Sequence, residues 1–199
     1  SGTSNVGGLI GALAGPRRIQ NATASVSVNG GDGVGGLVGF VNSFKNGTIQ
    51  DVRASGSVSG TSNVGGLVGI SDAVITDATA SGNVNGAGSV GGLVGVNVGT
   101  ITGATASGNV NGTESVGGLV GANFASDDGD GDVLVGTIRN TLAVGPVSGS
   151  SNVGGLLGAN TVPGITATGK VEDSYFDTQS TGQTISGGSA TGLTTDQMQ

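Results

Sequence analysis

This chain of 199 residues contains no cysteine, no histidine and no tryptophan, and its only aromatic side chains are one tyrosine and four phenylalanines. Without cysteine there is no disulfide framework and no thiol nucleophile. Without histidine there is no Ser-His-Asp triad and no imidazole ligand for zinc. A globular core built from large aromatic rings is excluded as well, so stability must come from small aliphatic side chains and backbone pairing.

Charge is also scarce, since 13 acidic and 6 basic residues give a net charge of −7. Arg17 and Arg18 form the only adjacent basic pair. Nucleic-acid binding requires a basic patch or stripe, so we expect no nucleic-acid partner. No apolar run reaches the roughly 18 residues of a membrane-spanning helix, so we expect no membrane span in this segment. The chain does not begin with methionine, and we interpret it as a processed or excised piece of a larger protein.

Glycine, in contrast, is abundant, and much of it belongs to one repeated motif. There are 44 glycines, and Val-Gly-Gly-Leu followed by an aliphatic residue and Gly occurs six times. The intervals between successive copies are 28, 30, 26, 26 and 37 residues, which is the range of repeat arrays. The copies lie at residues 6–11, 34–39, 64–69, 90–95, 116–121 and 153–158. We therefore predict one repeat domain over residues 1–172.

Three columns of apolar residues accompany the motif. The first holds its Leu and the next residue: Leu9/Ile10, Leu37/Val38, Leu67/Val68, Leu93/Val94, Leu119/Val120 and Leu156/Leu157. The second holds Ile19, Ile49, Ile75, Ile101, Ile138 and Val171, and the third holds Val28, Val58, Val84, Val110 and Val147. Val and Ile favour strands, and so many glycines would destabilise a helix.

This pattern predicts an all-β fold, namely a parallel β-solenoid, or β-helix. We expect about six coils stacked at roughly 4.8 Å, with two or three short strands in each coil and a right-handed path. The three columns should be buried as inward-facing stacks.

A corner recurs where Asn or Ser precedes Gly. The pairs are Asn29-Gly30, Ser59-Gly60, Asn85-Gly86, Asn111-Gly112 and Ser148-Gly149. Glycine permits a positive φ or a close approach of neighbouring backbone, and stacked Asn side chains can hydrogen-bond from coil to coil. We interpret these Asn and Ser residues as a ladder, and ordinary solvated turn residues are the alternative.

The interval of 37 residues contains an acidic insert at residues 125–135. Asp128, Asp130 and Asp132 alternate with Gly there, and carboxylate oxygens on a flexible turn are ligands that Ca²⁺ prefers. The spacing resembles the first half of an EF-hand loop, but Val133 takes the place of the turn glycine. A calcium site and a plain solvated acidic loop are the two interpretations.

Three acceptor sequons for N-glycosylation occur, at Asn21, Asn46 and Asn111. Such matches also arise by chance in a chain rich in Asn and Thr.

A threonine column, with Thr23, Thr79 and Thr105, raises the alternative of an ice-binding surface. That function needs an uninterrupted Thr array, and we expect Arg53 and Ala143 to occupy the same column and break it.

The repeated Val-Gly-Gly-Leu-Val-Gly core and the following Thr-Ile-x-x-Ala-x-Ala-x-Gly-x-Val-x-Gly segment resemble the GLUG repeat of large secreted and cell-surface proteins. Residues 173–199 are similar to the segment that closes such arrays, with Phe176 where tryptophan is common. The resemblance implies a surface-displayed β-solenoid with a structural or adhesive role, and it carries over no catalytic residue.

We therefore expect a secreted or cell-surface rod that serves as a spacer or contact surface and is not an enzyme. Its partners would be an extracellular glycan or protein ligand, or other copies of itself. Apart from calcium, no cofactor is expected. The alternative is a carbohydrate-active β-helix enzyme or carbohydrate-binding surface, which would show a groove lined by aromatic and charged side chains across successive coils.

Overall fold

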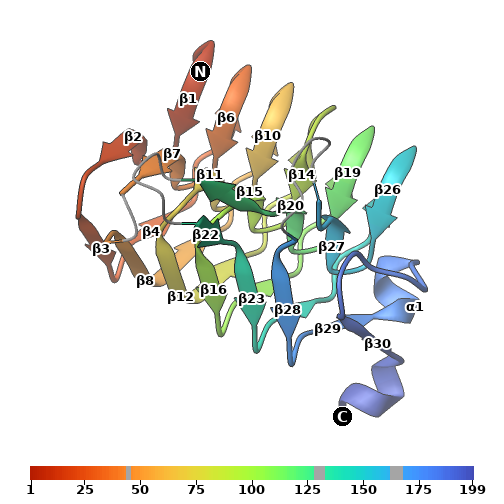
Figure 1. Ribbon diagram of the computed structural model, residues 1–199. Coiled ribbons are helices and arrows are strands. Elements are labelled where there is room, and N and C mark those ends of the chain that lie inside the picture. The colour runs from red at the N-terminus through yellow and green to blue at the C-terminus, as the bar shows by residue number, and fades with distance from the viewer. Residues whose placement is uncertain (44–45, 128–132, 162–167) are drawn as a thin grey trace.

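The computed structural model describes residues 1–43, 46–127, 133–161 and 168–199. The chain winds into a rod in which four parallel sheets, here called A, B, C and D, run along the coils (Figure 1). Each full coil contributes to the sheets in the order A, B, C and D. This nearly all-β, parallel architecture confirms the predicted fold class.

Sheets A and B each contain six strands within the described residues. Sheet A consists of β1 (Ser4–Gly7), β6 (Asp32–Gly35), β10 (Ser62–Gly65), β14 (Val90–Gly91), β19 (Glu114–Gly117) and β26 (Ser151–Gly154). Sheet B consists of β2 (Ile10–Ala14), β7 (Val38–Asn42), β11 (Val68–Ser71), β15 (Val94–Asn97), β20 (Val120–Asn123) and β27 (Leu157–Ala159).

Sheet C is the largest sheet and sheet D the narrowest. Sheet C consists of β3 (Arg18–Gln20), β4 (Thr23–Ala24), β8 (Thr48–Ala54), β12 (Val74–Ala80), β16 (Thr100–Thr102), β17 (Thr105–Ala106), β23 (Thr137–Arg139), β24 (Leu142–Ala143), β28 (Lys170–Glu172), β29 (Tyr175–Asp177) and β30 (Thr191–Leu193). Sheet D consists of β5 (Val28–Asn29), β9 (Val58–Ser59), β13 (Val84–Asn85), β18 (Val110–Asn111) and β25 (Val147–Ser148).

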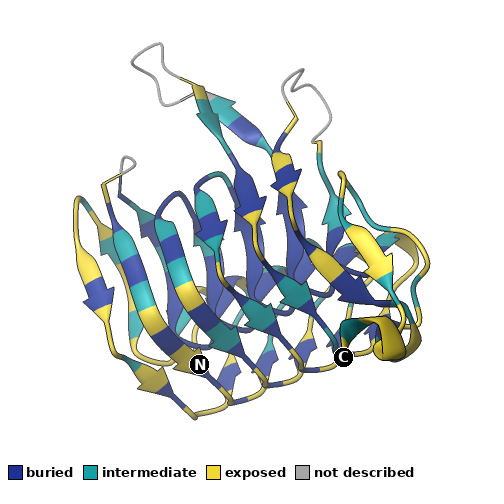
Figure 2. Cartoon of the chain, turned by 90° about the horizontal axis from the view of Figure 1, so that it is seen from below, coloured by how far each residue is buried: buried dark blue, intermediate teal, exposed yellow. Residues whose placement is uncertain are grey.

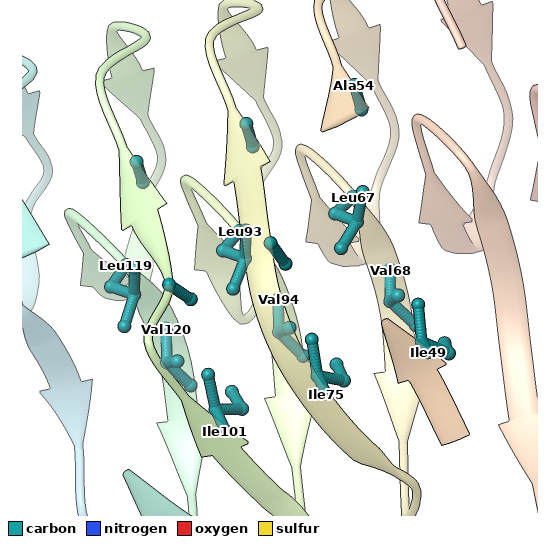
Figure 3. Packing of buried hydrophobic residues seen from close by; sticks show 14 of the residues in the cluster. Ile49, Ala54, Leu67, Val68, Ile75, Leu93, Val94, Ile101, Leu119 and Val120 are labelled. Atoms are coloured by element: carbon teal, nitrogen blue, oxygen red, sulfur yellow. The ribbon is translucent and has the colours of Figure 1, made fainter. Parts of the chain in front are cut away.

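Strands pair in register with their equivalents in the neighbouring coils. Ile75, for example, lies beside Ile49 on one side and Ile101 on the other. The motif's Leu residues, the Val that follows them and the Ile column form stacked rows between sheets B and C (Figure 3). The Val column of sheet D packs against the Val residues of sheet A in a second, smaller core.

The predicted burial of the columns is confirmed, including Ile19 and Val28 of the first coil, except for the motif's Leu and Ile in that coil. Leu67, Leu93 and Leu119 are 0% exposed, whereas the equivalent Leu9 is 57% exposed. Ile10 is half-buried. The reason is that the first coil has a described neighbour on only one side.

Each full coil contains a strand in all four sheets, rather than the two or three strands per coil that we expected. The Gly-Gly-Leu turn separates the sheet A strand from the sheet B strand, and the two sheets then pack backbone against backbone. A Cβ on Gly95 would lie 2.6 Å from the carbonyl carbon of Asn63 and 2.6 Å from the carbonyl oxygen of Gly69. Only glycine allows this approach.

The corner glycines are also explained by close approach. A Cβ on Gly60 would lie 2.8 Å from a methyl group of Val34 and 2.9 Å from one of Val64, and both residues belong to the smaller core between sheets A and D. The positive φ angles among the described glycines fall elsewhere, for example at Gly33 and Gly103.

The two ends of the insert, β21 (Ala125–Asp127) and β22 (Val133–Val135), pair with each other as an antiparallel hairpin. This hairpin projects from the side of the rod (Figure 2). Val133 is 57% exposed there.

The C-terminal segment covers the strand edges of the last coil. It contains β30, a single helical turn α1 (Thr178–Thr181) and a 3-10 turn η1 (Thr195–Met198). The backbone N–H of Gly155 donates to the carbonyl of Ile185 at 2.9 Å, and the N–H of Leu157 donates to Ser186 Oγ at 2.9 Å. Neither helical turn, nor any other described helix, has the length and apolarity needed to cross a membrane.

Candidate functional site

A groove runs along the outside of the rod between sheets A and B and spans several coils. We call it the A–B groove. It is lined by Asn63, Ile70, Ser89, Val96, Ser115, Ala122, Phe124, Asn152, Ala159 and Thr161. The lining thus takes equivalent residues from sheets A and B of successive coils.

The floor of the A–B groove is apolar and graded in depth. Ile70, Val96, Ala122 and Ala159 are register neighbours on sheet B, and their side chains become smaller from Ile through Val to the two Ala. Phe40 precedes them in the same column. The smaller side chains leave more room above the floor at the two alanines than at Ile70, and Phe124 and Thr161 also line the groove.

The rim of the A–B groove is polar and uncharged. Asn63, Ser115 and Asn152 occupy equivalent positions in three strands of sheet A, β10, β19 and β26, and have left-handed backbone conformations, with φ of 51°, 49° and 48°. Asn is among the few non-glycine residues that adopt this conformation readily. No acidic or basic side chain occurs among the described lining residues. The groove therefore offers amide and hydroxyl groups at about one coil spacing, roughly 4.8 Å, above an apolar floor.

A buried asparagine ladder lies directly beside the groove floor, and the sequence analysis missed it. Asn97 Nδ2 donates to Asn123 Oδ1 at 2.8 Å, and Asn123 Nδ2 donates to Asn160 Oδ1 at 3.2 Å. Asn97 and Asn123 are 0% exposed, and Asn123 Nδ2 also donates to the carbonyl of Gly136 at 3.0 Å. The available signal was an Asn four residues after the motif's Leu in the fourth, fifth and sixth copies.

Replacing Asn123 by Leu is expected to lower the free energy of unfolding by about 2–4 kcal/mol, because the buried polar groups of Asn97, Asn160 and Gly136 lose a partner. Urea denaturation followed by circular dichroism measures the change. Asn85→Leu, in the exposed corner ladder, is the matched control and should change stability by less than about 0.5 kcal/mol. Equal effects of the two substitutions would contradict the role assigned to the buried ladder.

The stacking of the predicted corner ladder is confirmed, on the outside of the rod. Asn29, Ser59, Asn85, Asn111 and Ser148 are register neighbours in sheet D. All are exposed except the half-buried Ser59, and Ser148 Oγ donates to Asn111 Oδ1 at 3.1 Å.

The threonine column is interrupted, but not by all the residues that we expected. Thr23, Arg53, Thr79 and Thr105 are register neighbours as predicted. The next position holds Leu142, and the expectation of Ala143 was wrong by one residue. Ala143 instead continues the buried alanine column beside Ala106, because side chains alternate between the two faces of a strand.

The three predicted glycosylation sites do not line the A–B groove. Asn21, Asn46 and Asn111 are all exposed. Asp128, Asp130 and Asp132 lie outside the described residues. In the part of the chain that the structure describes, no group of three Asp or Glu side chains is placed to hold a metal ion.

Comparison with protein families gives one match, between residues 60–85 and the GLUG motif. The chain contains a GLUG motif. The matched segment covers one coil, from the corner at Gly60 through β10, β11 and β12 to the next corner at Asn85. The other coils repeat this GLUG coil in register, as the strand pairing shows. No curated protein and no solved structure matches the chain.

Proposed function

We propose that the chain is a structural and adhesive rod of a secreted or cell-surface protein, that it is not an enzyme, and that the A–B groove is its contact surface. The observation that carries the proposal is the groove itself, which takes equivalent residues from successive GLUG coils. A stack of similar coils forms an extended surface well suited to an extended ligand. The coils that do not line the groove act as a spacer.

The chemistry of the lining favours an uncharged polysaccharide strand as the ligand. Such a strand presents C–H faces that can lie on Val96, Ala122 and Ala159, and hydroxyl groups that can exchange hydrogen bonds with Ser115 and Asn152. A charged polymer would find no ion-pair partner among the described lining residues. The depth beside Ala122 and Ala159 provides the most contact area for a sugar ring.

A carbohydrate-active enzyme is the alternative function. Glycoside hydrolysis generally uses two carboxyl groups, about 5–10 Å apart, on either side of the scissile bond. The described lining of the A–B groove contains no carboxyl group, which supports binding without catalysis.

Filling the groove provides the test. Ala122→Phe is expected to weaken binding to neutral polysaccharides at least about tenfold, because the ring occupies the deepest part of the floor. The fold should tolerate the change, since Phe40 occupies the same column three coils earlier in β7. Affinity electrophoresis through gels containing soluble β-glucan, mannan or galactan measures the binding.

Ala12→Phe, an exposed position of the same column outside the groove, is the control and should leave affinity unchanged. Retention by none of the three polysaccharides, or equal retention of the Ala122→Phe variant, would contradict the proposal. Shortening of a polysaccharide during incubation would instead establish the enzymatic alternative.

A further inference from the structure

A second hollow, of about 500 Å³, lies at the C-terminal end of the rod. Asn140, Leu142, Asp173, Tyr175, Leu193 and Met198 line it, and we call it the Tyr175 pocket. Its size is within the range of small-molecule sites, roughly 300–1,000 Å³. None of these residues belongs to the A–B groove, so the two sites are independent.

The apolar walls of the Tyr175 pocket come from two parts of the chain. Leu142 of β24 and Tyr175 of β29 are register neighbours on the outer face of sheet C. They continue the column that holds Thr79 and Thr105 in earlier coils, so the column becomes apolar and aromatic at this end. Tyr175 is the only tyrosine of the chain and is 40% exposed. Leu193 of β30 and Met198 of η1 add the remaining apolar surface (Figure 1 shows β30 beside β29).

The C-terminal wall is held in place by Asp177, the last residue of β29, which also contains Tyr175. Its carboxylate accepts a hydrogen bond from Thr195 Oγ1 at 2.7 Å and caps α1 by accepting from the N–H groups of Gln179 and Ser180. The bond from Thr195 holds the pKa of Asp177 below its ordinary value. One buried carboxylate thus connects β29, α1 and η1, so the pocket has a formed shape before any ligand arrives.

Two polar groups form the edge of the pocket. Asn140 and Asp173 occupy the same left-handed corner of successive coils, with φ of 51° and 44°. Within the described residues, the carboxylate of Asp173 has no hydrogen-bond or ion-pair partner, whereas the neighbouring Glu172 pairs with Arg139 at 3.4 Å. A carboxylate that only accepts and an amide that donates and accepts therefore lie about one coil spacing apart, roughly 4.8 Å.

We propose that the Tyr175 pocket binds a single pyranose ring of a neutral sugar. A pyranose carries hydroxyl groups around its edge, which suit Asp173 and Asn140, and C–H groups on its faces, which suit the Tyr175 ring and the side chains of Leu193 and Met198. A quaternary ammonium ligand fits less well, because sites for such cations enclose the charge between several aromatic rings and this pocket has one.

The single tyrosine makes the pocket directly observable. The chain has no tryptophan, so its tyrosine fluorescence comes from Tyr175 alone, and Tyr175 does not line the A–B groove. We expect methyl glucoside, galactoside, mannoside or N-acetylglucosamine, each titrated alone, to produce a saturable change with a Kd in the millimolar range. Asp173→Gly should weaken the tightest of these at least about tenfold. Glycine suits the left-handed backbone there, since Gly103 occupies the same column.

Asp77→Gly is the matched control, because Asp77 has the same corner conformation, φ 52°, but lies in another coil away from the pocket. It should leave the titration unchanged. Three results would overturn the proposal: no saturable change with any of the four sugars, equal affinity in Asp173→Gly, or saturation by choline at lower concentration than by any sugar. Since groove binding is measured by gel retention, failure here leaves the proposed function standing.

Discussion

Replacing Leu93 by Asp is expected to unfold the rod. Leu93 is 0% exposed and stacks between Leu67 and Leu119 in the core between sheets B and C (Figure 3). The carboxylate would be buried without a partner there, which costs about 3–5 kcal/mol in addition to the lost apolar contacts. Because stability is typically 5–15 kcal/mol, most molecules should be unfolded at moderate temperature. Far-UV circular dichroism and a thermal melt measure the loss.

Leu9→Asp is the matched control for this substitution. Leu9 holds the same position of the motif but is 57% exposed, so its carboxylate would remain hydrated. We expect a change below about 1 kcal/mol. If Leu93→Asp melted at the temperature of the unmodified chain, the register assigned to the core would be wrong.

Gly95→Ala is also expected to destabilise the rod, although it adds only a methyl group. The new Cβ would lie 2.6 Å from the carbonyl carbon of Asn63 and 2.7 Å from the N–H nitrogen of Val64. Backbone atoms in paired strands cannot move aside as flexible side chains do, so sheets A and B must separate locally. We expect the free energy of unfolding to fall by about 2–3 kcal/mol, measured by urea denaturation.

Gly88→Ala distinguishes crowding from the general effect of replacing a glycine. Gly88 lies in the turn before β14, has no positive φ, and its added Cβ would come no closer than 3.3 Å to another atom, Ser62 Cα. Its stability should change by no more than about 0.5 kcal/mol. A loss equal to that of Gly95→Ala would show that the close approach of the two sheets is not the cause.

The fold could be predicted from the sequence because the same pattern of apolar residues and glycines recurs in each coil. A Val or Ile that recurs every 26 residues must occupy equivalent positions in successive coils. Ile49, Ile75 and Ile101 therefore predict a buried stack even from a single sequence. The number of strands per coil was harder to predict. The strands of sheet D are only two residues long, for example Val84–Asn85, and such short strands leave no periodicity to detect.

The A–B groove could not be predicted, because its lining joins two sheets whose spacing is set by glycine. The sequence shows that Gly95 is repeated, but only the packed structure shows that it brings sheet B against Asn63 and Val64. The taper of the floor from Ile70 to Ala122 is visible in the sequence as a column of shrinking side chains. The taper indicates a groove only once it is known that this column faces outward, and the sequence pattern alone does not give that direction.

The buried asparagine ladder also bears on how near-identical coils avoid being exchanged during folding. Its column begins as Leu13 and Val41, changes to Ser71, and continues as Asn97 and Asn123. If a misplaced coil put Val41 where Asn123 lies beside Asn97, the buried amide of Asn97 would lose the partner that Asn123 provides. A buried asparagine fixes the alignment of two helices in a coiled coil by the same penalty. The buried polar residues thus specify which coil pairs with which in this repetitive chain.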